Sequence, residues 1–163
     1  MDFFVWLETS TVGAWINQSS SVFFAYPGIL LIHTLGLTLL VGSNVVIGLR
    51  ILGFAPEVPV IELRKLFPLM WTGLVLSVTS GTLLLTAKAT TMIVNPAFFI
   101  KMLAIIVAVA VLLRMRSKIF GDPQANGRVL AVISLVLWLV AITSGRMMAY
   151  VGEAAHFGAL ILK

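Results

Sequence analysis

The sequence predicts an all-α, polytopic membrane protein with four transmembrane helices and an N-terminal interfacial helix. Of the 163 residues, 60% are hydrophobic and 10% are charged, whereas soluble domains average about 45–50% apolar and about 25% charged residues. The mean hydropathy is +1.10. Four apolar stretches each reach the roughly 20 residues that one helical crossing needs. A soluble domain and a disordered chain are therefore both excluded.

The N-terminal segment, residues 1–21, is predicted to lie along the membrane interface as one short helix. Phe4, Leu7, Thr11 and Trp15 recur at helical spacing, and tryptophan is favoured at the interface. The alternative is that this segment is only an ordered entry to the first crossing. It lacks a basic start and a long apolar run, so it does not resemble a signal peptide.

The predicted four-helix bundle occupies residues 22–151. Its crossings run from about Val22 to Leu49, Leu66 to Ala87, Ala97 to Leu113, and Val129 to Tyr150. Pro27 falls in the first turns, where proline is tolerated, and Asn95-Pro96 signals a helix start. The segments 53–65 and 114–127 are predicted to be loops. The tail 152–163 is too short to cross and is predicted to face outward.

Basic residues near the ends of the crossings predict the orientation. Residues 1–21 contain none, the link 88–96 contains only Lys88, and most of the others cluster around 50–65 and 114–128. Lysine and arginine collect on the cytoplasmic side, so both termini are expected to face outward. The net charge of +5 and the pI of 10.1 thus indicate topology rather than nucleic-acid binding.

Three ionisable residues fall inside the predicted crossings: His33, Lys101 and Arg146. Each costs about 2.5–3.5 kcal/mol on insertion scales. Counting along the helices from the outer surface puts His33 about 15 Å deep, and Lys101 and Arg146 about 6 Å deep. All acidic residues lie outside the crossings and the chain has no cysteine. No catalytic constellation is therefore visible, and thiolate metal sites are excluded.

A stripe on the first crossing indicates which way the imidazole points. His33, Gly36, Leu40 and Asn44 share one helix face, because eleven residues at 100° each return to within about 20°. Lipid offers no hydrogen-bond partner to an imidazole or a carboxamide. We therefore expect this face to point into the bundle.

Each of these polar residues also has a purely structural interpretation. His33 could be neutral and hydrogen-bonded to Thr86, Ser144 or a backbone carbonyl. Lys101 and Arg146 lie close enough to the surface to extend along apolar surface to the headgroups.

Together the three residues are typical of a b-type haem site. A haem needs an imidazole for its iron and cations for its propionates, and His33, Lys101 and Arg146 would supply them. Candidates for the second axial position are Met102, Met147, Met148, a water or an open site. Electron transfer or membrane redox chemistry is the expected role, and whether the chain is an enzyme stays open.

Two alternatives compete with haem. Copper handling would use His33 with the outer methionines, since thioethers suit Cu(I), although Lys101 and Arg146 would repel a metal cation at its entrance. A cofactor-free accessory subunit would pack its small-residue faces against a larger membrane complex or a second copy of itself.

The chain resembles small bacterial inner-membrane proteins of four to five helices. The matching segments are HTLG at 33–36, LRILG at 49–53, SGTLL at 80–84, NPAFFIKM at 95–102 and GR at 145–146, with Gly42. This resemblance implies a multi-pass protein of the bacterial inner membrane.

Two known families are similar in layout. HemJ-type protoporphyrinogen oxidases, which are b-haem proteins, have the order of His33, Gly42, Arg50 and Lys101, but this chain lacks their later Arg…Asn-Glu-Pro element. Copper-resistance D-type membrane domains also place a histidine near a glycine in a helix, followed by a Gly-rich span. Both resemblances imply haem or metal binding without identifying a reaction.

Overall fold

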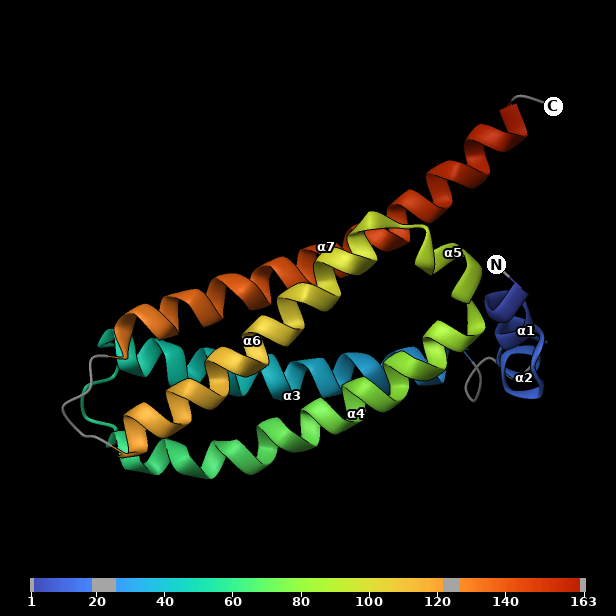
Figure 1. Ribbon diagram of the computed structural model, residues 1–163. Helices are drawn as coiled ribbons and strands as arrows, with labels where there is room; N and C mark the ends of the chain where they lie inside the picture. Colours follow the sequence, from blue (N-terminus) through green and yellow to red (C-terminus); the bar gives the residue numbers. More distant parts are fainter. Residues whose placement is uncertain (1, 19–25, 122–126, 162–163) are drawn as a thin grey trace. The chain divides into compact units, whose positions relative to one another are not determined.

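The computed structural model describes the backbone of residues 2–18, 26–121 and 127–161. It describes the side chains of residues 2–17, 26–117 and 127–148. All regular secondary structure of these residues is helical, and no strand occurs among them. The helices are α1 (Asp2–Thr9), α2 (Thr11–Gln18), α3 (Tyr26–Leu52), the 3-10 helix η1 (Val60–Lys65), α4 (Leu66–Ala87), α5 (Ala89–Ile93), α6 (Pro96–Gly121) and α7 (Arg128–Ile161) (Figure 1). The predicted all-α class is confirmed.

Four helical stretches are long and apolar enough to cross a membrane: Tyr26–Leu52, Val60–Ala87, Pro96–Ser117 and Arg128–Met148. Their surfaces carry large apolar side chains that are exposed. Leu103 is 65% exposed and Ile106 is 67% exposed. Apolar exposure on this scale is disfavoured in water but is what a lipid-facing helix requires. The number and approximate positions of the predicted long apolar helices are thus confirmed.

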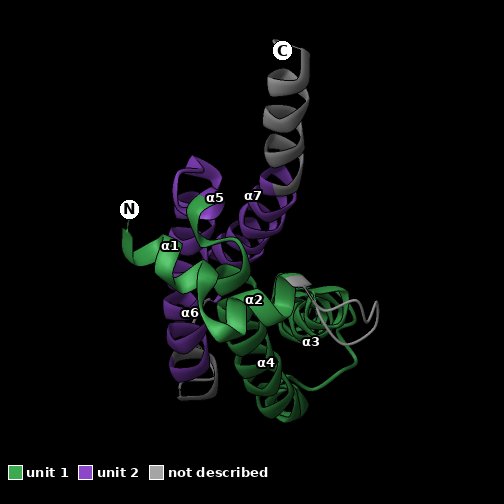
Figure 2. Ribbon diagram, turned by 90° about the vertical axis from the view of Figure 1, so that its right-hand side faces the viewer, with its two compact units in different colours: residues 1–90 green, residues 91–163 purple. Residues whose placement is uncertain are grey.

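The chain divides into two compact units, residues 1–90 and 91–163 (Figure 2). In the first unit, α3 and α4 pack along each other in antiparallel directions. Ile29 clusters with Leu84 near one end, and Gly36 meets Gly73 further along. Short helix-to-helix connections favour this arrangement of neighbouring helices.

The predicted inward stripe on α3 is confirmed by burial. Leu40 is 1% exposed and Asn44 is 0% exposed, and Gly36 is buried as well. The backbone of α3 at Gly36 and Leu40 approaches α4 at Gly73 closely. Small residues allow such an approach between membrane helices, where van der Waals packing replaces the hydrophobic effect.

The predicted single N-terminal helix is two helices, α1 and α2, which meet at Ser10. The hydroxyl of Ser10 accepts a hydrogen bond from the backbone N–H of Gly13 at 3.3 Å and so caps the start of α2. A Cβ atom on Gly13 would come within 2.4 Å of the carbonyl oxygen of Glu8. The corner therefore depends on a glycine, and helical periodicity alone did not reveal the break.

Polar contacts join α1 to the start of α5 and α2 to the end of α4. Glu8 Oε2 accepts hydrogen bonds from the backbone N–H of Thr90 at 3.2 Å and from its hydroxyl at 2.6 Å. Asn17 Nδ2 donates to the carbonyl of Ala87 at 2.8 Å. Ile16 is 2% exposed in an apolar cluster with Ile29, Leu84 and Ala87. These contacts satisfy backbone groups that a helix end leaves without intrahelical partners.

The second unit consists mainly of α6 and α7. Asn95 Oδ1 accepts a hydrogen bond from the backbone N–H of Ala97 at 3.0 Å, which confirms the predicted start of this helix at Asn95-Pro96. Two loop predictions were wrong in extent. Residues 114–121 continue α6, and η1 occupies the end of the predicted loop 53–65. Helix α7 continues to Ile161, through most of the predicted tail.

Other predicted boundaries vary in accuracy. Helix α4 begins and ends at the predicted residues, Leu66 and Ala87. Helix α3 extends to Leu52, three residues beyond the prediction. The predicted start of the first crossing, residues 22–25, lies outside the described residues.

Candidate functional site

The imidazole of His33 is held by one turn of the neighbouring helix α4. Its Nδ1 atom lies 3.0 Å from the carbonyl oxygen of Ser77 and 3.1 Å from the hydroxyl oxygen of Ser80. A carbonyl oxygen can only accept a hydrogen bond, so Nδ1 must carry a proton and donate it. In the neutral ring, Nε2 is then the nitrogen with the lone pair, and it is the atom that would bind a metal.

The hydroxyl of Ser80 is oriented to receive this proton. It lies 2.5 Å from the carbonyl oxygen of Leu76, to which it donates. With its hydrogen committed to its own helix, the Ser80 oxygen presents lone pairs to Nδ1. Ser80 is 3% exposed, so these contacts are shielded from competing solvent. The donor of His33 therefore meets two acceptors, Ser77 O and Ser80 Oγ.

Glycines on α4 make room for the histidine ring. A Cβ atom on Gly81 would lie 3.1 Å from Cε1 of His33 and 3.4 Å from its Nδ1. A Cβ atom on Gly73 would lie only 2.7 Å from the carbonyl oxygen of Gly36. The sequence of small residues along α4 therefore lets α3 come close enough for His33 to reach a backbone carbonyl.

Of the three hydrogen-bond partners predicted as alternatives for His33, the backbone carbonyl is the one used, and it belongs to Ser77. The hydroxyl of Thr86 instead donates to Leu83 at 2.6 Å, and that of Ser144 donates to Val140 at 2.6 Å. Sequence reasoning missed Ser80. The antiparallel register of the first two crossings, counted from their connection, is the signal that could have found it.

The two predicted cations belong to the second unit, whereas His33 belongs to the first. The side chain of Lys101 is half-buried and lies against Gly145 on α7, because a Cβ atom there would be 3.6 Å from both its Cδ and its Nζ. Arg146 follows Gly145 and is exposed. The expected common level of Lys101 and Arg146 on neighbouring helices agrees with this contact. One pocket shared with His33 stays a prediction.

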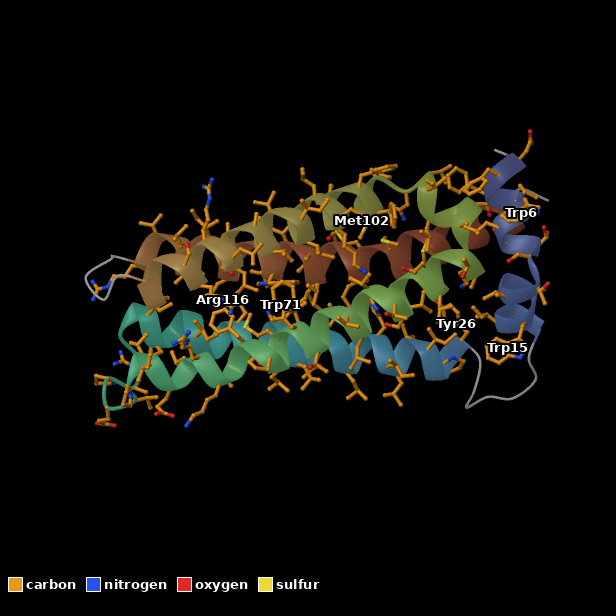
Figure 3. The ribbon with its side chains drawn as sticks, turned by 60° about the horizontal axis from the view of Figure 1, so that its bottom comes forward. Trp6, Trp15, Tyr26, Trp71, Met102 and Arg116 are labelled. Atoms are coloured by element: carbon orange, nitrogen blue, oxygen red, sulfur yellow. The ribbon has the colours of Figure 1, made fainter. Side chains whose placement is uncertain are left out.

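The predicted methionine ligands also lie in the second unit. Met102 is 38% exposed and Met147 is 59% exposed, while Met148 is half-buried. Figure 3 labels Met102 on α6. Within the described part of the chain, no group of three or more His, Asp or Glu side chains gathers in a way that could hold a metal ion.

The fold and site define a class of all-helical protein with four helices long and apolar enough to cross a membrane, in which a half-buried histidine of α3 is held by α4. The chain belongs to the family described as "Family of unknown function (DUF6644)", which it matches over residues 3–154. No curated protein and no solved structure matches the chain. These comparisons show no relationship to HemJ-type oxidases or to copper-resistance D-type domains.

Proposed function

We propose that this protein is an integral membrane protein that binds a b-type haem through Nε2 of His33. The observation that carries the proposal is the hydrogen bond from Nδ1 of His33 to the carbonyl of Ser77 at 3.0 Å. Histidines that bind metals commonly donate their other ring N–H to a carbonyl or carboxylate, which fixes the tautomer and makes the ligand nitrogen more basic.

The residues around His33 fit an axial haem ligand. Ser77 and Ser80 hold one edge of the ring, and Gly81 leaves no side chain against Cε1. An imidazole fixed in this way would be pre-organised for iron, since it need not give up a rotamer on binding. When bound, a b-type haem supplies one-electron redox chemistry. The role of this chain would be to bind, orient and shield it, for electron transfer or membrane redox chemistry.

Haem is better supported than copper. A copper site needs several ligands converging on one ion, and no group of three or more His, Asp or Glu occurs among the described residues, so copper would depend on methionine ligands. In a haem, four ring nitrogens already bind the iron, so the protein needs to supply at least one imidazole. The similarity in layout to HemJ-type oxidases, carried by His33 and Lys101, favours the same ligand.

The membrane setting belongs to the same proposal. We place the protein in the bacterial inner membrane with both termini outward, because the basic residues cluster around 50–65 and 114–128. Trp6 on α1 and Trp15 on α2, labelled in Figure 3, are 63% and 54% exposed. Tryptophan at the end of a crossing is typical of the headgroup region, which supports an interfacial position for α1 and α2.

Absorption spectroscopy of the purified full-length chain tests the proposal. Titration with haem is expected to give a saturable Soret band in the wild type and in His156→Ala, which removes the only other histidine of the sequence. His33→Ala is expected to lose that band. Wild-type protein that gives no saturable band, or His33→Ala that binds haem as tightly as the wild type, would reject haem ligation by His33.

A further inference from the structure

His33 lies one helical turn from an apolar cluster at the end of the first unit where α1 and α2 sit (Figure 1). On α3, Ile29 precedes His33 by four residues. On α4, Leu84 follows Ser80, one of the two acceptors of the imidazole, by four residues. Four residues advance a helix by about 6 Å along its axis. The cluster therefore lies between the imidazole and this end of the helix pair.

Helix α2 closes this end of the pair with one aliphatic side chain. The four buried members of the cluster, which we call the plug, are Ile16, Ile29, Leu84 and Ala87. All four side chains are hydrocarbon, so the plug offers water no hydrogen-bond partner. Ile16 is 2% exposed, whereas its neighbour Trp15 is 54% exposed. Helix α2 thus buries one large apolar side chain in the plug and leaves the next one exposed.

Two polar contacts hold α1 and α2 in this position. Asn17 Nδ2 donates to the carbonyl of Ala87, the last residue of α4, at 2.8 Å. Glu8 Oε2 accepts hydrogen bonds from the N–H and the hydroxyl of Thr90. Each of the two helices has only eight residues, and isolated helices of this length are unstable in water. Release of these contacts would therefore withdraw Ile16 from the plug without unfolding α3 or α4.

We propose that Ile16 seals the His33 site against water at this end of the helix pair, and that local release of α2 admits water to the imidazole. The seal keeps water from competing for Ser77 O and Ser80 Oγ, the two acceptors of the Nδ1 proton, and a hydrogen bond is stronger where water is excluded. For a haem bound at Nε2, the seal would also limit solvent access, which influences the redox potential. This last role rests on the proposed function, whereas the seal itself requires no haem.

Exchange of the Nδ1 proton of His33 with water tests the seal in the haem-free, full-length protein. In His156→Ala carrying ¹⁵N-histidine, His33 has the only labelled ring, and magnetisation transfer from water in nuclear magnetic resonance gives the exchange rate. We expect a resolved, slowly exchanging Nδ1 proton in this parent protein. Ile16→Ser is expected to raise the rate more than about tenfold, because it removes the contribution of a buried isoleucine side chain to the closed state. Asn17→Ala is expected to raise it about fivefold, the change in open population that loss of one hydrogen bond gives.

A matched variant separates sealing from a general effect on α2. Val12 lies on the same helix and is 47% exposed, so Val12→Ser makes a similar change outside the plug and should leave the exchange rate unchanged. If Ile16 served stability alone, Ile16→Ser would lower the unfolding temperature without changing exchange well below it. Circular dichroism checks that each variant is folded. If Ile16→Ser does not fold, Asn17→Ala, which leaves every plug side chain in place, decides the test.

Two results would overturn the seal. An Nδ1 proton that exchanges as fast in the parent protein as in free histidine would show that water already reaches the imidazole. Exchange that neither Ile16→Ser nor Asn17→Ala accelerates beyond Val12→Ser would show that α2 does not control the path of water. Because no haem is present, either result leaves haem binding by His33 untouched, and a failure of haem binding would leave the seal untouched.

Discussion

Gly36 on α3 and Gly73 on α4 bring the two helix backbones into direct contact. A Cβ atom on Gly73 would lie 2.7 Å from both the carbonyl oxygen of Gly36 and the backbone nitrogen of Leu40. Neither of these backbone atoms can move aside without shifting a whole helix. The crossing lies one turn from Ser77, so it also sets the distance that His33 must span to reach its hydrogen-bond acceptors.

Gly73→Ala is therefore expected to destabilise the first unit. Forcing an extra methyl group into a well-packed contact typically costs about 1–3 kcal/mol. Unfolding of the detergent-solubilised protein, followed by circular dichroism, measures the loss. Gly42→Ala is the matched control, because a Cβ atom there meets nothing within 4 Å. It should match or exceed the wild type in stability, since alanine is a better helix former than glycine. Equal stability of Gly73→Ala and the wild type would contradict the close crossing.

Ser80→Ala tests the part that the hydroxyl plays in holding His33. The variant removes one of two acceptors for the Nδ1 proton and leaves Ser77 O in place. Haem affinity is expected to fall about tenfold, the lower end of the range for losing a partner of a metal-binding histidine. A haem titration measures this change. Thr79→Val is the control, because its hydroxyl bonds only Val75 within α4. An affinity equal to that of the wild type would show that Ser77 suffices.

Glu8→Gln tests how α1 is joined to the start of α5. The carboxylate receives two hydrogen bonds from Thr90, and a neutral acceptor is weaker by about 1 kcal/mol. Amide hydrogen exchange across residues 2–18 is expected to quicken about fivefold, the population change that this energy gives. Glu57→Gln, in an exposed loop, should leave exchange unchanged. Unaltered exchange in Glu8→Gln would mean that apolar contacts such as Ile16 hold these helices alone.

Labelling of introduced cysteines tests the predicted orientation, and the chain suits it because it contains no natural cysteine. Asp2→Cys and Glu57→Cys both replace exposed residues. A maleimide that cannot cross membranes is expected to label Asp2→Cys in intact cells, and Glu57→Cys only after permeabilisation. This result follows from the basic residues around 50–65. The reverse pattern would invert the topology.

The fold was largely predictable where charged residues border an apolar stretch of the sequence. Helix α4 was predicted to the residue because charged Arg64 and Lys65 precede it and Lys88 follows it. The stripe through Leu40 and Asn44 was predicted because helical periodicity is strong in a long apolar helix. Composition and periodicity carry this information locally, without reference to any partner helix.

Features that depend on neighbouring helices were not predictable in the same way. Helix α6 continues through Arg114 and Arg116, which were assigned to a loop because they are charged. Long basic side chains can remain on a helix where it leaves the apolar layer. The break at Ser10 and the contact between His33 and Ser80 arise from capping and helix register. Helical periodicity reveals neither of them, and the second emerges only when α3 and α4 are aligned from their connection.

The central claim is that a single nitrogen of His33 binds haem iron. Pulsed electron paramagnetic resonance of the ferric complex tests it most directly, with ¹⁵N-histidine incorporated into His156→Ala so that His33 is the only labelled ring. Because Nδ1 donates to Ser77, we expect hyperfine coupling from a directly bound imidazole nitrogen, and its loss when His33→Ala is added. Absence of any histidine ¹⁵N coupling in a haem-loaded sample would contradict ligation by His33.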